Sequence, residues 1–217
     1  DTANVAHYCF DFDGTTLRSF KNGILQGSCA FSGNTNIVPI FGVMFANSIG
    51  INVKLYAMEI VKKSKHTSNF KVDLSNPYFP VQETFVDVWV DPSERKNLTI
   101  ATGVSDIKER SGNDLHFTQA TTAYQPALMQ GYANGLPALD FDGTTKYMAL
   151  PAVDFPKPKE WLVECLVNLQ NVSGSRAIMG QGNSGGDSIT SAITVSIYTG
   201  YPNKLLYQFG NDSVSSY

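Results

Sequence analysis

Apolar and polar residues alternate in short runs along most of this chain. Alternation with a period of two is typical of a half-buried strand, because successive side chains of a strand point to opposite faces. Helical periodicity is nearly absent, and its best candidate, 56–65, also fits a strand that ends in a charged tail. The pattern predicts strands at 7–13, 17–21, 24–31, 37–45, 51–61, 85–90, 98–101, 138–141, 147–150, 161–169, 176–179, 192–198 and 205–209. This series predicts an all-β protein built as a sandwich.

Signals for tight turns separate several of these runs. Asn22-Gly23 predicts a type I′ hairpin turn, because both central positions of that turn need a positive φ. The hexapeptide Asp-Phe-Asp-Gly-Thr-Thr occurs twice, at 11–16 and at 140–145. In each copy we expect the second Asp to bind the backbone of its own turn and the Gly to take a positive φ. The predicted structural turn residues are Asp13, Gly14, Asn22, Gly23, Asp142 and Gly143.

The first copy of the hexapeptide also resembles the first motif of the haloacid dehalogenase-like phosphatases. That resemblance implies that Asp11 attacks phosphorus and that Asp13 handles the leaving-group proton. The family places this motif on a parallel strand followed by helices of a doubly wound sheet. Here a second predicted strand and an Asn-Gly hairpin follow within ten residues. A motif that occurs twice also suits a turn better than a unique nucleophile, so we predict no phosphatase activity.

Composition favours a packed core and gives little sign of a charged partner. Of the 217 residues 42% are hydrophobic and only 16% are charged, which is the opposite of the balance in disordered chains. The formal net charge is -3, and the only basic cluster, 62–66, is predicted to be a solvated linker. No apolar run approaches the roughly 20 residues of a membrane helix. We therefore expect neither nucleic-acid binding nor membrane insertion.

Cysteine and histidine give no strong signal for chemistry. An odd number of cysteines without short spacings argues against a disulfide framework and a zinc site. The three are Cys9, Cys29 and Cys165. Cys9 and Cys29 lie in neighbouring predicted strands and are able to pair, although buried free thiols are the favoured expectation. A lone histidine is usually structural, which is the prediction for His7, His66 and His116.

Three stretches between residues 87 and 150 carry a likeness to a known family. They are VSDIKERSGN (104–113), HFTQ (116–119) and GYANGLPALDFDG (131–143). They resemble the concanavalin A-like, laminin G-like jelly-roll domains, above all those of phage and bacterial surface proteins. The family often has Trp where this chain has Ile107 and Asp where it has Glu109. The resemblance implies a two-sheet antiparallel jelly-roll sandwich.

The resemblance covers most of the chain, but the two halves of the family's domain occur in reversed order along it. Residues 1–64 resemble the C-terminal half of such a jelly roll, 65–84 form a connector, and 85–217 resemble the N-terminal half. Three arrangements fit: a circular permutant, two pieces of a tandem array, and halves exchanged between neighbouring chains. A half sandwich alone would leave an open apolar face and an unpaired edge, so one completed domain is favoured.

Two predicted loops have the chemistry of sugar recognition. Sugar sites on such folds combine an aromatic platform with amide and carboxylate side chains, because a ring stacks on C–H groups and amides bind hydroxyls. The candidate glycan-binding residues are Asn183, Asp187, Tyr198, Tyr201 and Asn203. Ordinary turns with an exposed Tyr explain the same residues. Oxygen-rich loops of this kind are also candidates for Ca²⁺.

No catalytic residues are predicted. Some relatives of this fold hydrolyse glucans with a Glu-x-Asp-x-x-Glu strand, and no such run is present. The nearest pair, Glu160 and Glu164, would stand about 13 Å apart by strand rise, whereas glycoside hydrolysis needs its carboxyls within about 10 Å. Solvation at a sheet edge is the expected role of this pair.

These observations lead to three functional hypotheses. The first is a non-catalytic virion or surface protein, such as a phage fibre, spike or capsid decoration, that contacts copies of itself, neighbouring virion proteins or a cell-surface glycan. The second is a secreted carbohydrate-binding module of a bacterial enzyme. The third is a relative of the glycoside hydrolases. The expected location is the virion, the cell surface or the extracellular space, and this part rests on the family resemblance alone.

Overall fold

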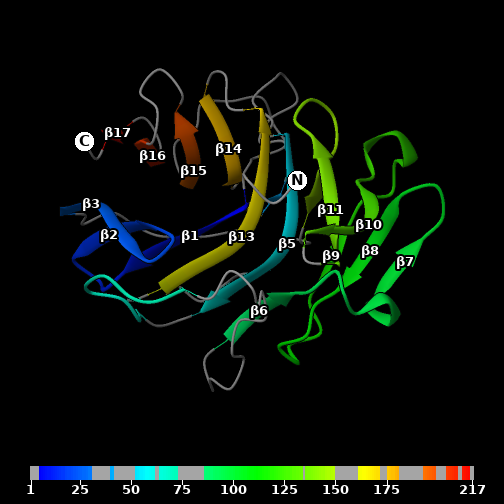
Figure 1. Ribbon diagram of the computed structural model, residues 1–217, viewed down its shortest axis with the longest axis horizontal. Coiled ribbons are helices and arrows are strands. Elements are labelled where there is room, and N and C mark those ends of the chain that lie inside the picture. Colours follow the sequence, from blue (N-terminus) through cyan, green and yellow to red (C-terminus); the bar gives the residue numbers. More distant parts are fainter. Residues whose placement is uncertain are drawn as a thin grey trace.

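The protein is an antiparallel β-structure in a computed structural model (Figure 1). The structure describes residues 5–30, 40–41, 52–61, 64–72, 86–133, 135–149, 161–171, 175–180, 193–198, 204–209 and 212–215. The described strands are β1 (Val5–Phe12), β2 (Thr16–Lys21), β3 (Ile24–Ala30), β4 (Ile40–Phe41), β5 (Asn52–Val61), β6 (Val86–Val90), β7 (Leu98–Ile100), β8 (Val104–Lys108), β9 (His116–Thr118), β10 (Ala127–Ala133), β11 (Leu136–Asp142), β12 (Met148–Ala149), β13 (Trp161–Asn171), β14 (Ser175–Gly180), β15 (Ile193–Tyr198), β16 (Lys204–Phe209) and β17 (Asp212–Ser215). Two short 3-10 helices, η1 (Arg95–Asn97) and η2 (Thr122–Tyr124), interrupt this series, and the described ranges contain no α-helix.

The described strands form two sheets. The first contains eight strands in the order β10-β11-β5-β13-β1-β2-β3, with β6 paired to β5 beside this path. The second contains nine strands in the order β17-β16-β15-β14-β4-β12-β9-β8-β7. Both sheets combine strands from residues 1–64 with strands from residues 85–217, for example β1 with β13 in the first sheet and β4 with β14 in the second.

Strand β13 is the centre of the eight-stranded sheet. It pairs with β1 along one side and with β5 along the other, and both ladders are antiparallel. The long strand β5 has two partners on its far side, because β11 pairs with its first half and β6 with its second half. Three strands distant in sequence therefore lie side by side, as the blue, yellow and cyan ribbons of Figure 1 show.

The main hydrophobic core lies between the two sheets, which makes the described part a β-sandwich. Period-two alternation places Ala6, Tyr8, Phe10 and Phe12 of β1 on the core side. The nine-stranded sheet contributes the buried side chains Val104, Ile107, Phe117 and Met148 to the same core. Burial of this apolar surface is the main driving force that joins two sheets face to face.

The opposite face of the eight-stranded sheet has a second, smaller cover. Residues 64–72, here called the strap, run across β1 and β2 on the face turned away from the main core. The Phe70 ring of the strap packs on a cluster formed by Cys9, Phe20, Val61 and Leu162. Strand β13 is consequently buried on both faces over residues 162–168, which explains its nearly continuous apolar sequence.

The strand pattern was predicted well in some places and poorly in others. The alternative of a helix at 56–65 is wrong, because residues up to Val61 belong to β5. The first three predicted strands agree with β1, β2 and β3 to within two residues at each end. Strands β8, β9 and β10 were not predicted. The sequences of β8 (VSDIK) and β9 (HFT) contain one or two apolar residues without period-two alternation, and β10 (ALMQGYA) begins with a short apolar run that Gln and Gly interrupt.

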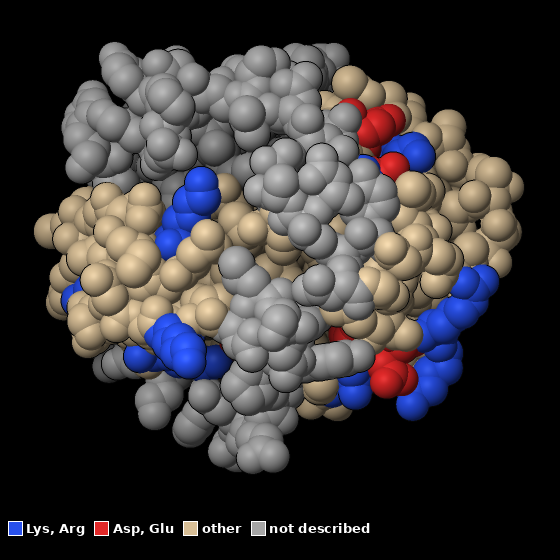
Figure 2. Space-filling model, viewed as in Figure 1, with Lys and Arg blue, Asp and Glu red and all other residues tan. Residues whose placement is uncertain are grey.

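The charged side chains visible in Figure 2 stand in separate groups among uncharged ones. The largest basic group in that view is a run of blue side chains at the lower right edge, beside a red group. None of the helices in the described ranges has the length and apolar character required to cross a bilayer.

Candidate functional site: a cluster of cysteine, histidine and glutamate

The predicted glycan-binding loops lie largely outside the described part of the chain. Asn183, Asp187, Tyr201 and Asn203 fall outside the described residues, and Tyr198 is described only as the last backbone position of β15. Glycan binding and a Ca²⁺ site in these loops therefore stay predictions. Glu160 also falls outside the described residues, whereas Glu164 lies in the middle of β13.

The repeated hexapeptide forms the same hydrogen-bonded turn in both copies. The first carboxylate oxygen of Asp13 accepts hydrogen bonds from the backbone N–H groups of Thr15 (3.0 Å) and Thr16 (2.8 Å). In the second copy Asp142 accepts from the backbone N–H groups of Thr144, Thr145 and Lys146.

The residues that follow the two carboxylates have the backbone conformation that such turns require. Gly14 and Gly143 have φ of 92° and 73°. At the separate hairpin turn between β2 and β3, Asn22 and Gly23 also have positive φ, of 52° and 76°. The hydrogen bonds from Thr16, with those from Arg18 and Thr15, hold the pKa of the Asp13 carboxyl well below its usual range. Burial alone would raise the pKa of Asp142, but the hydrogen bonds of the turn outweigh burial and lower it.

The strap covers a row of three ionisable side chains that lie on neighbouring strands. Cys9 on β1 lies directly opposite Glu164 on β13, and Glu164 lies directly opposite Glu59 on β5. All three residues are buried, with exposed fractions of 0% for Cys9 and Glu59 and 5% for Glu164. Directly opposed residues of antiparallel strands have their Cβ atoms roughly 5 Å apart, so this row is a continuous contact across three strands.

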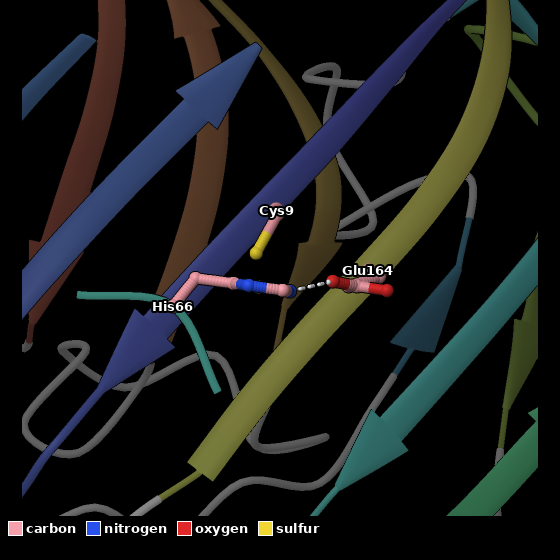
Figure 3. A group of neighbouring side chains, drawn as sticks. All are labelled: Cys9, His66 and Glu164. Carbon is pink, nitrogen blue, oxygen red and sulfur yellow. Dashed lines mark hydrogen bonds and ion pairs between the residues drawn. The ribbon is translucent and has the colours of Figure 1, made fainter. Parts of the chain in front are cut away.

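Histidine 66 of the strap completes the cluster. Its Nε2 atom lies 2.8 Å from Oε1 of Glu164, and its ring points across β1 towards that carboxylate (Figure 3). The sulfur of Cys9 lies next to both groups, and one ligand atom from each of the three residues falls within 4.8 Å of the other two. On the other side of the carboxylate, His7 Nε2 lies 3.7 Å from Oε2 of Glu164.

Asp11 fixes the strap above this cluster. Its buried carboxylate accepts hydrogen bonds from the backbone N–H groups of Lys65 (2.6 Å) and His66 (2.9 Å), and from the hydroxyl of Ser64. Asp11 and Cys9 point to the same face of β1 because they are two residues apart. Because two of these hydrogen bonds come from the backbone of Lys65 and His66, they fix the point of the chain from which the His66 imidazole extends.

Aromatic contacts close the cluster from the outside. The Phe70 ring is stacked on the His66 ring with centroids 3.6 Å apart and an angle of 11° between the planes. The same ring meets Phe20 edge to face at 5.2 Å. The histidine is therefore clamped between an aromatic face and the carboxylate to which it is hydrogen-bonded.

The two glutamates of the row differ in their ionisation. Burial raises the pKa of Glu59 to about 7, with Lys65 opposing this effect at 2.7 Å and the negative charge of Glu164 adding to it. Burial alone would raise the pKa of Glu164, but His66 and His7 outweigh it and hold the pKa well below its usual range. The pair thus combines one ionised carboxylate with one carboxyl that binds a proton near neutrality.

The cysteines are free thiols. Cys9 and Cys165 are buried and Cys29 is partly buried, and none of the three forms a disulfide. Burial, followed by the negative charges of Glu164 and Asp11, raises the pKa of Cys9 well above its ordinary value. Cys9 therefore stays a protonated thiol unless a cation joins the cluster.

Two predictions made from the sequence are wrong for these residues. Glu164 is not solvated at a sheet edge, because β13 is central and its carboxylate is covered by the strap. Residues Ser64, Lys65 and His66 do not form a solvated linker, because they bind Asp11, Glu59 and Glu164.

The sequence contained a signal for both features. A single charged residue inside the apolar run of 161–167 indicates a buried ion with a distant partner. The outward positions of β1, which are His7, Cys9 and Asp11, are all polar or ionisable, as expected for a face that contacts another polar segment.

Comparisons with known protein families, with curated proteins and with solved structures found no match.

Proposed function

We propose that residues 1–64 and 85–217 form one jelly-roll sandwich of the concanavalin A-like type, in which the C-terminal half of the fold comes first in the sequence. The proposal is supported by the sequence resemblance and by the mixed composition of both sheets, each of which takes strands from the two ranges. In the eight-stranded sheet β13 lies between β1 and β5, so the two ranges share their longest ladders.

The function that this arrangement supports best is a non-catalytic structural or adhesion role on a virion or cell surface. One observation carries the proposal: in the only His/Cys/Glu cluster found among the described residues, Cys9 and Glu164 are buried, and the partly exposed His66 is bound to Glu164. Groups that fasten a strap to a sheet are not accessible to a substrate. The location on a virion or cell surface rests on the family resemblance, because a fold does not determine a function.

The proposed partners are other copies of the chain, neighbouring virion proteins or a cell-surface glycan. Sandwich proteins of this kind present loops and sheet faces to such partners. Glycan contact is assigned to Asn183, Asp187, Tyr198, Tyr201 and Asn203, whose side chains combine ring faces with amide and carboxylate groups. A carbohydrate-binding module is the alternative within the same class, and it differs in acting as a monomer.

Mass photometry together with a glycan array tests this proposal. A trimer or larger assembly is expected for a virion component, whereas a monomer that binds defined glycans indicates a carbohydrate-binding module. Tyr201→Ala should weaken any glycan signal, while Tyr124→Ala, which removes an exposed aromatic side chain elsewhere, should leave it unchanged. A monomer that binds no glycan contradicts both forms of the proposal.

A hydrolase is the second candidate, and one observation favours it. Glu59 and Glu164 lie opposite each other with pKa values shifted in opposite directions, which is the relationship between the acid and the nucleophile of a retaining glycosidase. Their burial beneath the strap argues against it. Release of reducing sugar that disappears in both Glu59→Gln and Glu164→Gln would establish this activity and overturn the non-catalytic role.

A further inference from the structure

We propose that Cys9, His66 and Glu164 form a binding site for a divalent transition-metal ion, with Zn²⁺ as the preferred ion. The thiol sulfur, an imidazole nitrogen and a carboxylate oxygen lie within 4.8 Å of one another. Zinc binds these three atom types at about 2.0–2.3 Å, so its ligands stand roughly 3.2–3.8 Å apart in a tetrahedral site. The three side chains need only small movements to reach this spacing.

The backbone positions all three ligands before any ion arrives. Cys9 and Glu164 are directly opposed residues of β1 and β13, inside the most extensively paired part of the sheet. His66 is held by the hydrogen bond from its own backbone to Asp11 and by the stacked ring of Phe70. A metal ion would therefore replace the hydrogen bond between His66 and Glu164 without a rearrangement of the chain.

The charge of the ligand set favours a divalent ion in a buried place. A thiolate and a carboxylate together carry two negative charges, and a neutral imidazole adds none. A divalent ion makes this set neutral, which removes the cost of burying uncompensated charge. On binding, the ion displaces the thiol proton of Cys9, and solvent takes up that proton. The proton that His66 Nε2 donates to Glu164 also leaves this nitrogen, because the neutral imidazole then carries its proton on Nδ1.

The atoms around the cluster provide support beyond the three ligands. Oε2 of Glu59 is buried and accepts no hydrogen bond from the described residues, and the Glu59 carboxyl, when protonated, hydrogen-bonds Glu164 on the opposite strand. A water molecule on the fourth position of the ion would give this oxygen a donor. His7, 3.7 Å from the other oxygen of Glu164, would orient the carboxylate from behind.

The ligand types discriminate between ions. Ca²⁺ and Mg²⁺ require shells of oxygen atoms, and this cluster offers a single carboxylate with sulfur and nitrogen. Thiolate and imidazole together suit zinc, which is redox-inactive and adopts the tetrahedral geometry of small mixed sites. The consequence is structural, because the ion would tie the strap to β1 and β13 through His66.

The test uses the full chain, reduced and freed of metal with a chelator, and then titrated with Co²⁺ as a spectroscopic substitute for zinc. The expected result is one equivalent of Co²⁺ with a thiolate-to-cobalt charge-transfer band and visible bands of tetrahedral intensity, followed by their loss when Zn²⁺ is added. Zinc at a hundredfold excess over its dissociation constant should raise Tm by roughly 5–10 °C.

Matched variants assign the ligands. Cys9→Ser and His66→Gln should abolish the charge-transfer band or weaken metal binding at least tenfold. Cys29→Ser removes a thiol outside the cluster, and His116→Gln removes a histidine that pairs with Asp106. Both controls should bind the metal as the unchanged chain does.

Two results would overturn the proposal. One is a chain that shows neither the cobalt band nor a rise in Tm with zinc, and the other is a band that Cys29→Ser removes. Should Cys9→Ser fail to fold, the unchanged chain and His66→Gln still decide, because His66 is partly exposed and lies outside the sheet. A band that persists in His66→Gln at unchanged affinity counts against the site.

Discussion

At the turn between β2 and β3, Gly23 has a φ of 76° and lies against the strap. A Cβ atom at this position would stand 1.9 Å from the carbonyl oxygen of Phe70, whose own N–H donates to the carbonyl of Gly23 at 2.9 Å. Gly23→Ala should therefore destabilise the fold by about 2–5 kcal/mol, through left-handed strain and displacement of the strap. Chemical denaturation followed by circular dichroism measures the change.

Gly112 provides the matched control. It has a φ of 93°, but no atom lies within 4 Å of the position that its Cβ would take. Gly112→Ala should cost only the conformational strain of about 1–2 kcal/mol. Equal losses in the two variants would show that the strap does not press on Gly23.

The two turn aspartates predict a pH dependence of stability. Because the folded pKa of Asp13 and Asp142 is lowered, each carboxylate stabilises the fold above its unfolded pKa of about 4, and this contribution is lost as the pH falls through the folded pKa. Asp13→Asn and Asp142→Asn should each lower stability at pH 7 by about 0.5–1.5 kcal/mol.

The pH profile of these two variants separates the contribution of the carboxylate charge to stability from that of the side-chain shape. The deficit relative to the unchanged chain should shrink as the pH is lowered from about 5 towards 2, because the aspartate of the unfolded chain then binds a proton while the folded carboxylate stays ionised. Thermal melts across this range measure it. A deficit of constant size would mean that the carboxylate charge contributes nothing.

Turn residues and cluster residues differ in how far the sequence alone predicts them. The turn at Asp13 was predictable because its hydrogen bonds reach only two or three residues along the chain. The contact between His66 and Glu164 joins residues 98 positions apart. No local pattern encodes such a distance, so His66 looked like part of a basic linker until the sheet brought β13 beneath it.

Among the larger elements, the strap receives the hydrogen bonds of its first backbone N–H groups at a single carboxylate, that of Asp11. Asp11→Ala would leave the backbone N–H groups of Lys65 and His66 without their acceptor. Losing buried hydrogen bonds of this kind costs about 1–3 kcal/mol each, which corresponds to at least about tenfold more frequent local opening. Trypsin should consequently cleave after Lys65 or Lys71 about tenfold faster, as followed by mass spectrometry under native conditions.

The internal repeat supplies the control for this experiment. Asp140 is the counterpart of Asp11 in the second hexapeptide, and its carboxylate lies 3.4 Å from Nζ of Lys54, away from the strap. Asp140→Ala should leave cleavage after Lys65 and Lys71 unchanged. If both variants accelerate cleavage equally, the strap opens with the whole sheet and not by itself.

The strands themselves were predictable wherever one face is apolar and the other is polar. Strand β1 has this alternation, so its position followed from the sequence. Strand β10 (ALMQGYA) does not, because apolar residues stand on both of its faces and only Gln130 is clearly polar. Strand order was not predictable in either case, since antiparallel pairing between distant segments depends on the complete sheet.

For the whole molecule, the interleaved strands predict a single unfolding transition. Neither β1 nor β5 keeps its main partner without β13, so the segment 1–61 should not unfold separately from the segment 86–171. Far-ultraviolet circular dichroism and tryptophan fluorescence should give coincident denaturation curves. Two separate transitions would indicate independent halves and would count against one completed domain.

The central position of β13 also means that the eight-stranded sheet cannot be completed early in synthesis. Strands β1 and β5 are made early during synthesis, yet the strand that joins them begins at Trp161, about 100 residues after Val61. At roughly 5–20 residues per second the ribosome needs about 5–20 s to deliver it. During that interval the early strands have open edges and exposed apolar faces. A nascent chain of this design therefore depends on being shielded before its sheet can close.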